Sequence, residues 1–418
     1  MTDSPAATAS LPRWKLLLFW AILVGLVALV LEGTSRLYLK LFRGFDGQHL
    51  LEYEFDPYKN ILPTRNYRDT RGIQHNSVGF RRSSEVSIEK PAGTYRIFIM
   101  GGSTAYGVGG QWTHLQREFE VIRNEQTIDA NLQKELNAAL PGRKIEVINA
   151  AITSTWSHHH LIYLNQTILK YRPDMVIFID GFNDYYFVDK GHDQFASYAY
   201  QEQSNGIMGD PTIASLIQAN AWWFYRKSAF GYVTIRALRD LKTAVKTMIS
   251  RATRPAMVVP DALAGLHDVF PRNALKMVER NVMLVRNEGA TPVLVLQPML
   301  ILERDRSGMP EVEKKLFDFD VQSLLPNYES FIHQAVPWVS DTARKVVEGK
   351  GGVFMDATGI FHDAQGQIFT DYVHLTPHAN ELVAHFIAGR ILPIISGAAT
   401  PSTPGPTSPR TSVARPVR

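Results

Sequence analysis

The stretch Arg96–Gly107, RIFIMGGSTAYG, marks the first strand of a predicted α/β sheet. Ile97–Met100 is an uninterrupted apolar run, which is typical of a parallel strand that is buried on both faces. Gly101 and Gly102 end the run and Ser103 follows at once, so the serine is expected at the carboxyl end of the strand, where open α/β sheets bind ligands. Taken alone, the stretch favours a structural Gly-Ser turn; residues far downstream favour a functional serine.

The amino-acid composition excludes several classes of function. The chain has 418 residues, of which 45% are hydrophobic and 20% are charged, as in globular proteins with a large core. The formal net charge of +4 is small for this length, so no nucleic-acid partner is expected. The absence of cysteine excludes disulfides, thiolate metal sites and a cysteine nucleophile. No metal or cofactor is expected, and the three histidines His158–His160 are predicted to lie on the surface.

The N-terminal region carries a candidate membrane segment. Residues 1–12 are small and polar and are predicted to be disordered. Leu16–Leu31 is an apolar run preceded by Trp14 and Lys15, and no small-residue cleavage site follows it. We therefore predict an uncleaved transmembrane signal anchor over residues 13–36, rather than a cleaved signal peptide or a buried core helix. Basic residues flank both ends, so charge alone does not assign its orientation.

Residues 37–94 have poor periodicity and are predicted to be an approach or linker segment, while residues 95–395 alternate between strand and helix patterns. This alternation predicts a flavodoxin-like three-layer α/β/α domain with a parallel sheet of about five strands. Residues 396–418 are rich in Pro, Ser and Thr and are predicted to be a disordered tail. The predicted strands are Arg96–Met100, Ile145–Asn149, Met175–Asp180, Pro292–Gln297 and Gly352–Asp356, and the predicted helices are Ile128–Leu140, His160–Tyr171, Arg272–Asn287 and Pro377–Ile394.

A long interval interrupts the α/β pattern at residues 185–270 and is predicted to be a helical lid insertion, because it is too long for one crossover. Within it, the segment Arg236–Arg251 combines apolar residues at helical spacing with basic residues and the single acid Asp240. Such a helix fits either an anionic membrane surface or a lid with a solvated basic face, and the two readings are compatible.

Polar residues at four predicted strand ends suggest a catalytic site. Because parallel strands end at one edge of the sheet, Ser103, Ala151, Asn183 and the pair Asp371/His374 are expected to gather there. His374 can take the proton of the Ser103 hydroxyl, and Asp371 can fix the imidazole tautomer. The backbone N–H groups of Ser103 and Ala151 and the amide of Asn183 can form an oxyanion hole. Considered separately, Asp371 and His374 fit a helix cap equally well, and Asn183 fits a turn.

These residues resemble the SGNH hydrolase superfamily, also called GDSL lipases and esterases. Gly101-Gly102-Ser103 matches its first block with glycine in the middle position, and Gly181-Phe182-Asn183-Asp184 and Asp371/His374 match its third and fifth blocks fully. The second block differs from the family pattern, because Ala151 occupies the position where the family has glycine. Alanine still provides the backbone N–H that the glycine would provide. The resemblance covers residues 95–185 and 290–392. Asn76–Arg81, NSVGFR, is also similar to a bacterial subset with an N-terminal membrane helix.

The resemblance implies a membrane-anchored serine esterase that forms an acyl-Ser103 intermediate. Its implied substrates are acyl esters, namely O-acyl groups of an envelope polysaccharide or a lipid. Two alternatives remain open: an O-acyltransferase that uses the same triad, and a non-catalytic envelope assembly or binding protein on the same fold. In each case we expect a single-pass N-terminal anchor through Leu16–Leu31, with the large domain in the periplasm or outside the cell.

Overall fold

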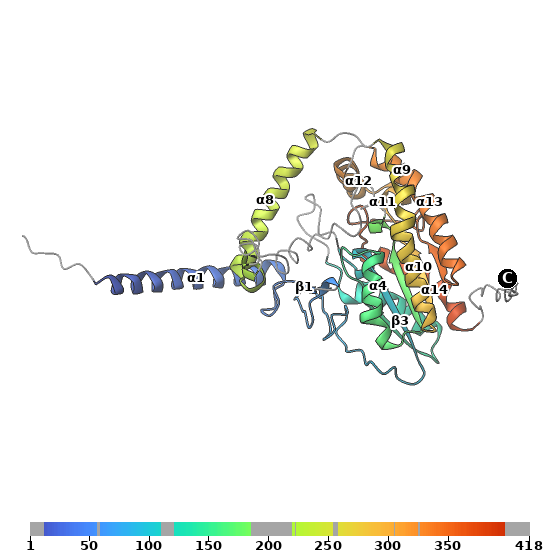
Figure 1. Cartoon of the computed structure of the whole chain (residues 1–418), viewed down its shortest axis with the longest axis horizontal. Helices are drawn as coiled ribbons and strands as arrows, with labels where there is room; N and C mark the ends of the chain where they lie inside the picture. The colour runs from blue at the N-terminus through green and yellow to red at the C-terminus, as the bar shows by residue number, and fades with distance from the viewer. Residues whose placement is uncertain are drawn as a thin grey trace, which may run out of the picture. The chain divides into compact units, whose positions relative to one another are not determined.

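The computed structural model describes residues 12–56, 59–109, 121–184, 220–221, 223–253, 258–304, 306–324 and 327–397. The predicted disordered ends, apart from residues 12, 396 and 397, and residues 185–219 of the predicted insertion lie outside this part. The chain forms two compact units. Of the described residues, those within the ranges 1–52, 68–70 and 202–252 belong to the smaller unit, and those within 53–67, 71–201 and 253–418 belong to the larger unit (Figure 1).

The larger unit holds every strand among the described residues. They are β1 (Tyr53–Asp56), β2 (Asn60–Pro63), β3 (Thr94–Gly101), β4 (Lys144–Asn149), β5 (Met175–Asp180), β6 (Thr291–Leu296) and β7 (Val353–Asp356). Its helices are α2 (Ser103–Tyr106), α3 (Ile128–Ala139), α4 (Ser157–Gln166), α9 (Val259–Phe270), α10 (Lys276–Asn287), α11 (Leu300–Glu303), α12 (Glu311–Leu324), α13 (Tyr328–Gly349) and α14 (Pro377–Ile395). Short helical turns are η1 (Asn124–Gln126), η2 (Ile168–Tyr171), η3 (Pro271–Leu275) and η4 (Arg306–Gly308).

The central sheet confirms the predicted fold. Its five strands are all parallel and lie in the order β4-β3-β5-β6-β7, which is the flavodoxin-like order. The first strand, β3, therefore lies between β4 and β5, and the chain switches direction across the sheet at this point. Every residue of β5 is buried, as its continuous apolar sequence predicts. The five predicted strands match the observed ones, and Met175–Asp180 has the predicted bounds.

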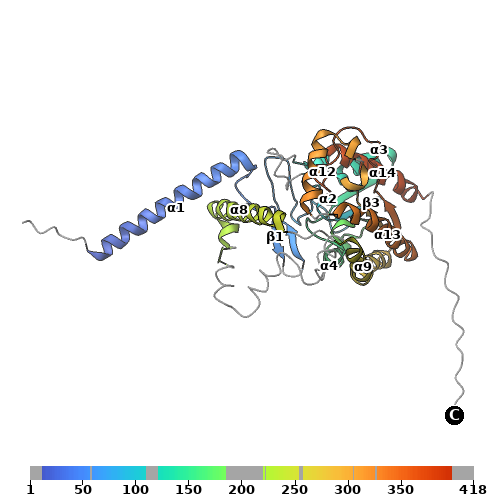
Figure 2. The same ribbon diagram turned by 90° about the horizontal axis from the view of Figure 1, so that it is seen from above.

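Helices cover both faces of this sheet (Figure 2). Helices α3 and α14 pack together on one face, and α4, α10 and α13 cover the other. Two predicted helices differ in detail. The segment His160–Tyr171 is the end of α4 followed by the 3₁₀ turn η2. The segment Arg272–Asn287 begins within the π-helical turn η3, which starts at Pro271, a residue that has no backbone N–H to donate.

Two segments predicted to lie outside the α/β pattern contribute to its core. The approach segment at residues 37–94 forms the hairpin β1–β2 and buries Ile61, Leu62 and Phe80 in the core of the larger unit. At the end of the predicted lid insertion, Leu266 and Phe270 of α9 belong to the same core. In both segments the apolar residues are separated by turn and charged residues, so periodicity does not reveal which of them are buried.

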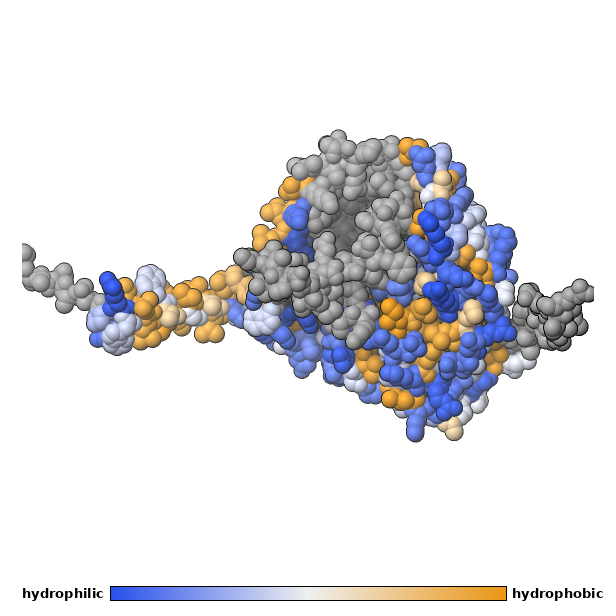
Figure 3. All heavy atoms as spheres, in the orientation of Figure 1, coloured by the Kyte–Doolittle hydropathy of each residue, from blue (hydrophilic) through white to orange (hydrophobic). Residues whose placement is uncertain are grey.

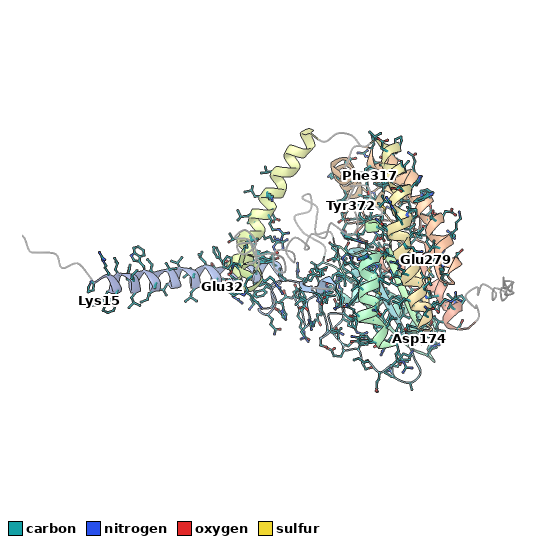
Figure 4. The ribbon with its side chains drawn as sticks, in the orientation of Figure 1. Lys15, Glu32, Asp174, Glu279, Phe317 and Tyr372 are labelled. Atoms are coloured by element: carbon teal, nitrogen blue, oxygen red, sulfur yellow. The ribbon has the colours of Figure 1, made fainter. Side chains whose placement is uncertain are left out.

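The smaller unit contains α1 (Arg13–Arg43), which continues beyond the predicted anchor end at Arg36, and α8 (Ala229–Thr253). An 18-residue window of α1 has a mean hydropathy of 2.5 and is 0% buried, so α1 is long and apolar enough to cross a membrane. Its exposed apolar residues are visible in Figure 3. Glu32 lies where α1 meets α8 (Figure 4) and accepts hydrogen bonds from Ser228 Oγ at 2.7 Å and Ala229 N at 3.0 Å.

Candidate active site

Three side chains from two distant parts of the sequence form one hydrogen-bonded line. Ser103 begins α2 directly after β3 and is half-buried. Its Oγ lies 2.7 Å from Nε2 of His374, and Nδ1 of His374 lies 2.5 Å from Oδ2 of Asp371. The side chains of His374 and Asp371 are almost fully buried. This arrangement can move a proton from the serine hydroxyl to the imidazole while the carboxylate holds the ring.

Two glycines allow Ser103 to occupy this position. Gly101 has a φ of +150°, and a Cβ there would lie 2.2 Å from the backbone oxygen of Ile179. A Cβ on Gly102 would lie 2.7 Å from Nδ2 of Asn183. The turn that follows β3 therefore passes so close to β5 that a larger residue would displace either the sheet or Asn183.

The loop before α14 presents the carboxylate and the imidazole. Oδ1 of Asp371 accepts the backbone N–H groups of Val373 at 2.9 Å and His374 at 2.8 Å. The N-cap of α14 is Thr376, whose side chain accepts the N–H of Ala379. The alternative prediction, in which Asp371 and His374 cap this helix, is therefore wrong. Burial raises the pKa of Asp371, but the contact with His374 and the backbone hydrogen bonds outweigh burial and lower it below its ordinary value.

Two buried glutamates support the chain just before this loop. Glu303 accepts the N–H groups of Gly359 at 2.8 Å and Phe361 at 2.9 Å. Glu313 accepts the N–H of Ile368 at 2.6 Å. Burial raises the pKa of Glu303 to about 7, in spite of these backbone hydrogen bonds. The polar groups of an otherwise irregular segment are thus satisfied in the interior, which restricts how far the loop can move.

The three predicted oxyanion-hole donors differ in whether they already donate a hydrogen bond within the protein. The Nδ2 group of Asn183 donates one hydrogen bond to the backbone oxygen of Thr155 at 2.7 Å and has a second hydrogen available. No partner within the described part of the chain accepts the backbone N–H of Ser103. The N–H of Ala151, by contrast, donates to Oδ1 of Asn149 at 3.1 Å. A substrate oxygen would have to compete with the Asn149 side chain for that N–H.

Further contacts join the loops that carry these residues. Thr104, next to Ser103, donates to the backbone oxygen of Val373 at 3.2 Å and accepts a hydrogen bond from Gln297 at 3.3 Å. Gln297 directly follows β6, and this place in the sequence makes it a candidate substrate contact. In the structure, however, its side-chain amide donates to Thr104. The rings of Phe182 and Tyr372 lie 5.2 Å apart, and Tyr372 is labelled in Figure 4. These contacts therefore connect the turn that carries Ser103 with the loop that carries His374, and they connect the segment that carries Asn183 with the same loop.

A buried polar cluster lies on α4, on β5 and just after β5, and it overturns the surface prediction for two of the three histidines, since only His158 is partly exposed. His159 and His160 are each 3% exposed. His160 Nδ1 pairs with Asp180 at 2.8 Å; burial lowers the pKa of His160, but this carboxylate outweighs burial and raises it. Burial and the charge of Asp180 raise the pKa of Asp184 to about 7, while Ser157 Oγ donates to it at 2.6 Å. Among the described residues, no group of three or more His, Asp or Glu side chains could hold a metal ion.

Comparison with known proteins gave structural neighbours only. No family model matches the sequence, and no curated protein matches it. An acetylxylan esterase from Geobacillus stearothermophilus (Axe2) is 11% identical, with 71% of this chain and 94% of that chain covered and a TM-score of 0.35. An acetyl xylan esterase (AlAXEase) is 13% identical, with 71% and 99% covered and a TM-score of 0.35. An alpha/beta hydrolase enzyme from the metagenome of Lake Arreo, Spain, is 14% identical, with 71% and 96% covered and a TM-score of 0.35.

Proposed function

We propose that this chain is a serine hydrolase of the SGNH type that cleaves carboxylic esters. The observation that carries the proposal is the line from Ser103 through His374 to Asp371, with distances of 2.7 Å and 2.5 Å. A nucleophile, a base and a group that orients the base are the three parts that acyl transfer through serine requires. They lie at the carboxyl ends of parallel strands, where open α/β sheets place their ligands.

The proposed reaction proceeds by two displacements. Ser103 Oγ attacks the ester carbonyl carbon while Nε2 of His374 takes the hydroxyl proton. The tetrahedral intermediate collapses, the alcohol leaves with the proton from His374, and the acyl group remains on Ser103. Water then attacks this acyl group, His374 accepts a proton from the water, and the second tetrahedral intermediate releases the carboxylic acid. The proton returns to Ser103 Oγ, and the enzyme is regenerated.

Two donors are proposed for the developing oxyanion. They are the backbone N–H of Ser103 and the free hydrogen of the Asn183 amide, whose position is fixed by its hydrogen bond to Thr155. Each such donor is typically worth about 3 kcal/mol of barrier lowering. Ala151 is proposed as a third donor only if its N–H leaves Asn149. The proposed substrates are O-acyl groups of an envelope polysaccharide or a lipid ester, as the resemblance of the three blocks implies.

Labelling with a fluorophosphonate probe tests this function. The wild-type protein should form a covalent adduct and hydrolyse p-nitrophenyl acetate, and the Ser103→Ala variant should do neither, because the probe requires an activated serine hydroxyl. Ser330→Ala, which removes an exposed hydroxyl on α13, is the matched control and should label like the wild type. A folded wild type that stays unlabelled and inactive would refute the proposal. An adduct that forms without hydrolysis would point to acyl transfer.

We also propose that α1 anchors the protein in a membrane and that α8 lies on the anionic surface beside it. The apolar part of α1 ends at Glu32, and the carboxylate of Glu32 receives the first N–H groups of α8, so α8 begins where the apolar segment stops. Along α8, Leu238 and Leu241 are more than 60% exposed. Basic residues dominate the helix, which suits anionic headgroups. We place the larger unit outside the cytoplasm.

Membrane fractionation tests the anchor. The full chain should sediment with membranes, resist extraction by high salt and dissolve in detergent, because an apolar helix inserted in a bilayer is not released by charge screening. A chain that lacks residues 1–31 should bind membranes only weakly and be released by salt. A C-terminal alkaline phosphatase fusion reports the side, since it is active outside the cytoplasm. Full-length protein in the soluble fraction without detergent would contradict the proposal.

A further inference from the structure

Arg81 is a buried cation in contact with the turn that carries Ser103. It is 2% exposed, and Nη1 donates to the backbone oxygens of Tyr106 and Gly107 at 2.8 Å each. Nη2 donates to the backbone oxygen of Ile122. The guanidinium also lies over the ring of Tyr106, 4.4 Å from its centroid. Tyr106 is the last residue of α2, the helix that Ser103 begins, so Arg81 holds the far end of that helix.

The backbone of Arg81 connects the same helix to the end of β4. Its N–H donates to the backbone oxygen of Asn149 at 3.0 Å. The side chain of Asn149 donates to the backbone oxygen of Ala105 at 3.2 Å, and it accepts the N–H of Ala151 at 3.1 Å. Arg81 and Asn149 therefore tie together the two strand ends that carry Ser103 and Ala151.

The sequence NSVGFR explains how a residue so far before Ser103 reaches it. Oδ1 of Asn76 accepts the N–H groups of Val78, Gly79 and Phe80 at 3.0 to 3.1 Å, which folds the segment into a tight turn. Phe80 is fully buried, and its ring packs 5.6 Å from that of Phe98 on β3. The turn and the anchored phenylalanine together direct the next residue, Arg81, into the interior beside α2.

We infer that Arg81 is a positioning residue that holds Ser103 in line with His374. The inference rests on the proposed function, because it takes Ser103 as the nucleophile. Helix α2 has only 4 residues, so it gains little stability of its own and its last carbonyls lack helical partners. Arg81 satisfies two carbonyls at this end and adds a positive charge where the helix dipole favours one. It acts through α2 and does not contact the substrate.

Substitution of Arg81 tests this role. Arg81→Ala should lower kcat by about 100-fold with little change in KM, since a displacement of about 1 Å in a reacting group has an effect of that size. Arg81→Lys keeps the charge but lacks the planar fork of donors, so most of the loss should remain. Guanidinium ion added at millimolar concentration should restore part of the kcat of Arg81→Ala. A purely structural role predicts no such rescue.

Arg96 is the matched control because it is equally buried in the same domain. It is 0% exposed and bonds to Glu146 and to the backbone oxygens of Ser87 and Tyr171, near the start of β3 and away from Ser103. Arg96→Lys should lower the thermal midpoint as Arg81→Lys does, while the folded protein keeps its kcat. The inference about Arg81 would be overturned if both variants lost kcat equally per folded molecule, or if Arg81→Lys kept the wild-type kcat. Neither result would overturn the proposed function. An unreactive wild type would overturn the proposed function as well.

Discussion

The His374→Ala variant is expected to lose at least about 10⁴-fold in kcat/KM for ester hydrolysis. In the structure Nε2 of His374 lies 2.7 Å from Ser103 Oγ, and no other described side chain makes a hydrogen bond to that hydroxyl. Without the imidazole the hydroxyl must lose its proton to water, so both the acylation and the deacylation steps slow. Steady-state kinetics with p-nitrophenyl acetate measures the loss, and the rate of fluorophosphonate labelling should fall in parallel.

Thermal unfolding distinguishes this loss from misfolding. The His374→Ala variant should unfold in one cooperative transition, as the wild type does, while its kcat/KM per folded molecule falls. His378→Ala serves as the control, because His378 is exposed on α14 only a few residues away. A His374→Ala protein that keeps more than about a tenth of the activity, far above what loss of a triad base allows, would contradict the proposed mechanism.

The sequence predicts the fold because strand signals are strong where the sheet is most buried. Met175–Asp180 is apolar until its last residue and is followed by Gly181, and every residue of that strand is buried. Once the strands are placed as parallel neighbours, their carboxyl ends have to share one edge. Ser103 and His374 can therefore be predicted to meet, although 271 residues separate them, and the structure places their side chains in contact.

The parts that sequence could not predict depend on side-chain direction. A charged residue such as Arg81 normally indicates an exposed position, and only the three-dimensional path of NSVGFR shows that its guanidinium is buried. The surface prediction for His159 and His160 is wrong for the same reason. Ala151 is a second example. The sequence shows that Ala151 has a backbone N–H, but it does not show that this N–H donates to the Asn149 side chain.

Asp371→Asn is expected to lower kcat by about 10⁴-fold although the substitution barely changes the shape of the side chain. The Asp371 carboxylate is fully buried and accepts hydrogen bonds from Val373 N, His374 N and His374 Nδ1. Its lowered pKa keeps it ionised at neutral and mildly acidic pH, so it can accept all three. An asparagine amide has one accepting oxygen and one donating nitrogen, so it cannot satisfy three donors.

Either orientation of the amide in the Asp371→Asn variant impairs the base. If the amide oxygen keeps the two backbone N–H groups, the NH₂ group faces Nδ1 of His374, which must then accept a hydrogen bond. Nε2 becomes the protonated nitrogen, which cannot receive a proton from Ser103. If the amide turns over, the NH₂ opposes two backbone donors and the loop is destabilised. Asp356→Asn is the control, because Asp356 also binds a loop through Thr358, and the variant should keep most of its activity. Comparable kcat in Asp371→Asn and Asp356→Asn would mean that Asp371 only stabilises its loop, and the proposed triad would then lack its third member.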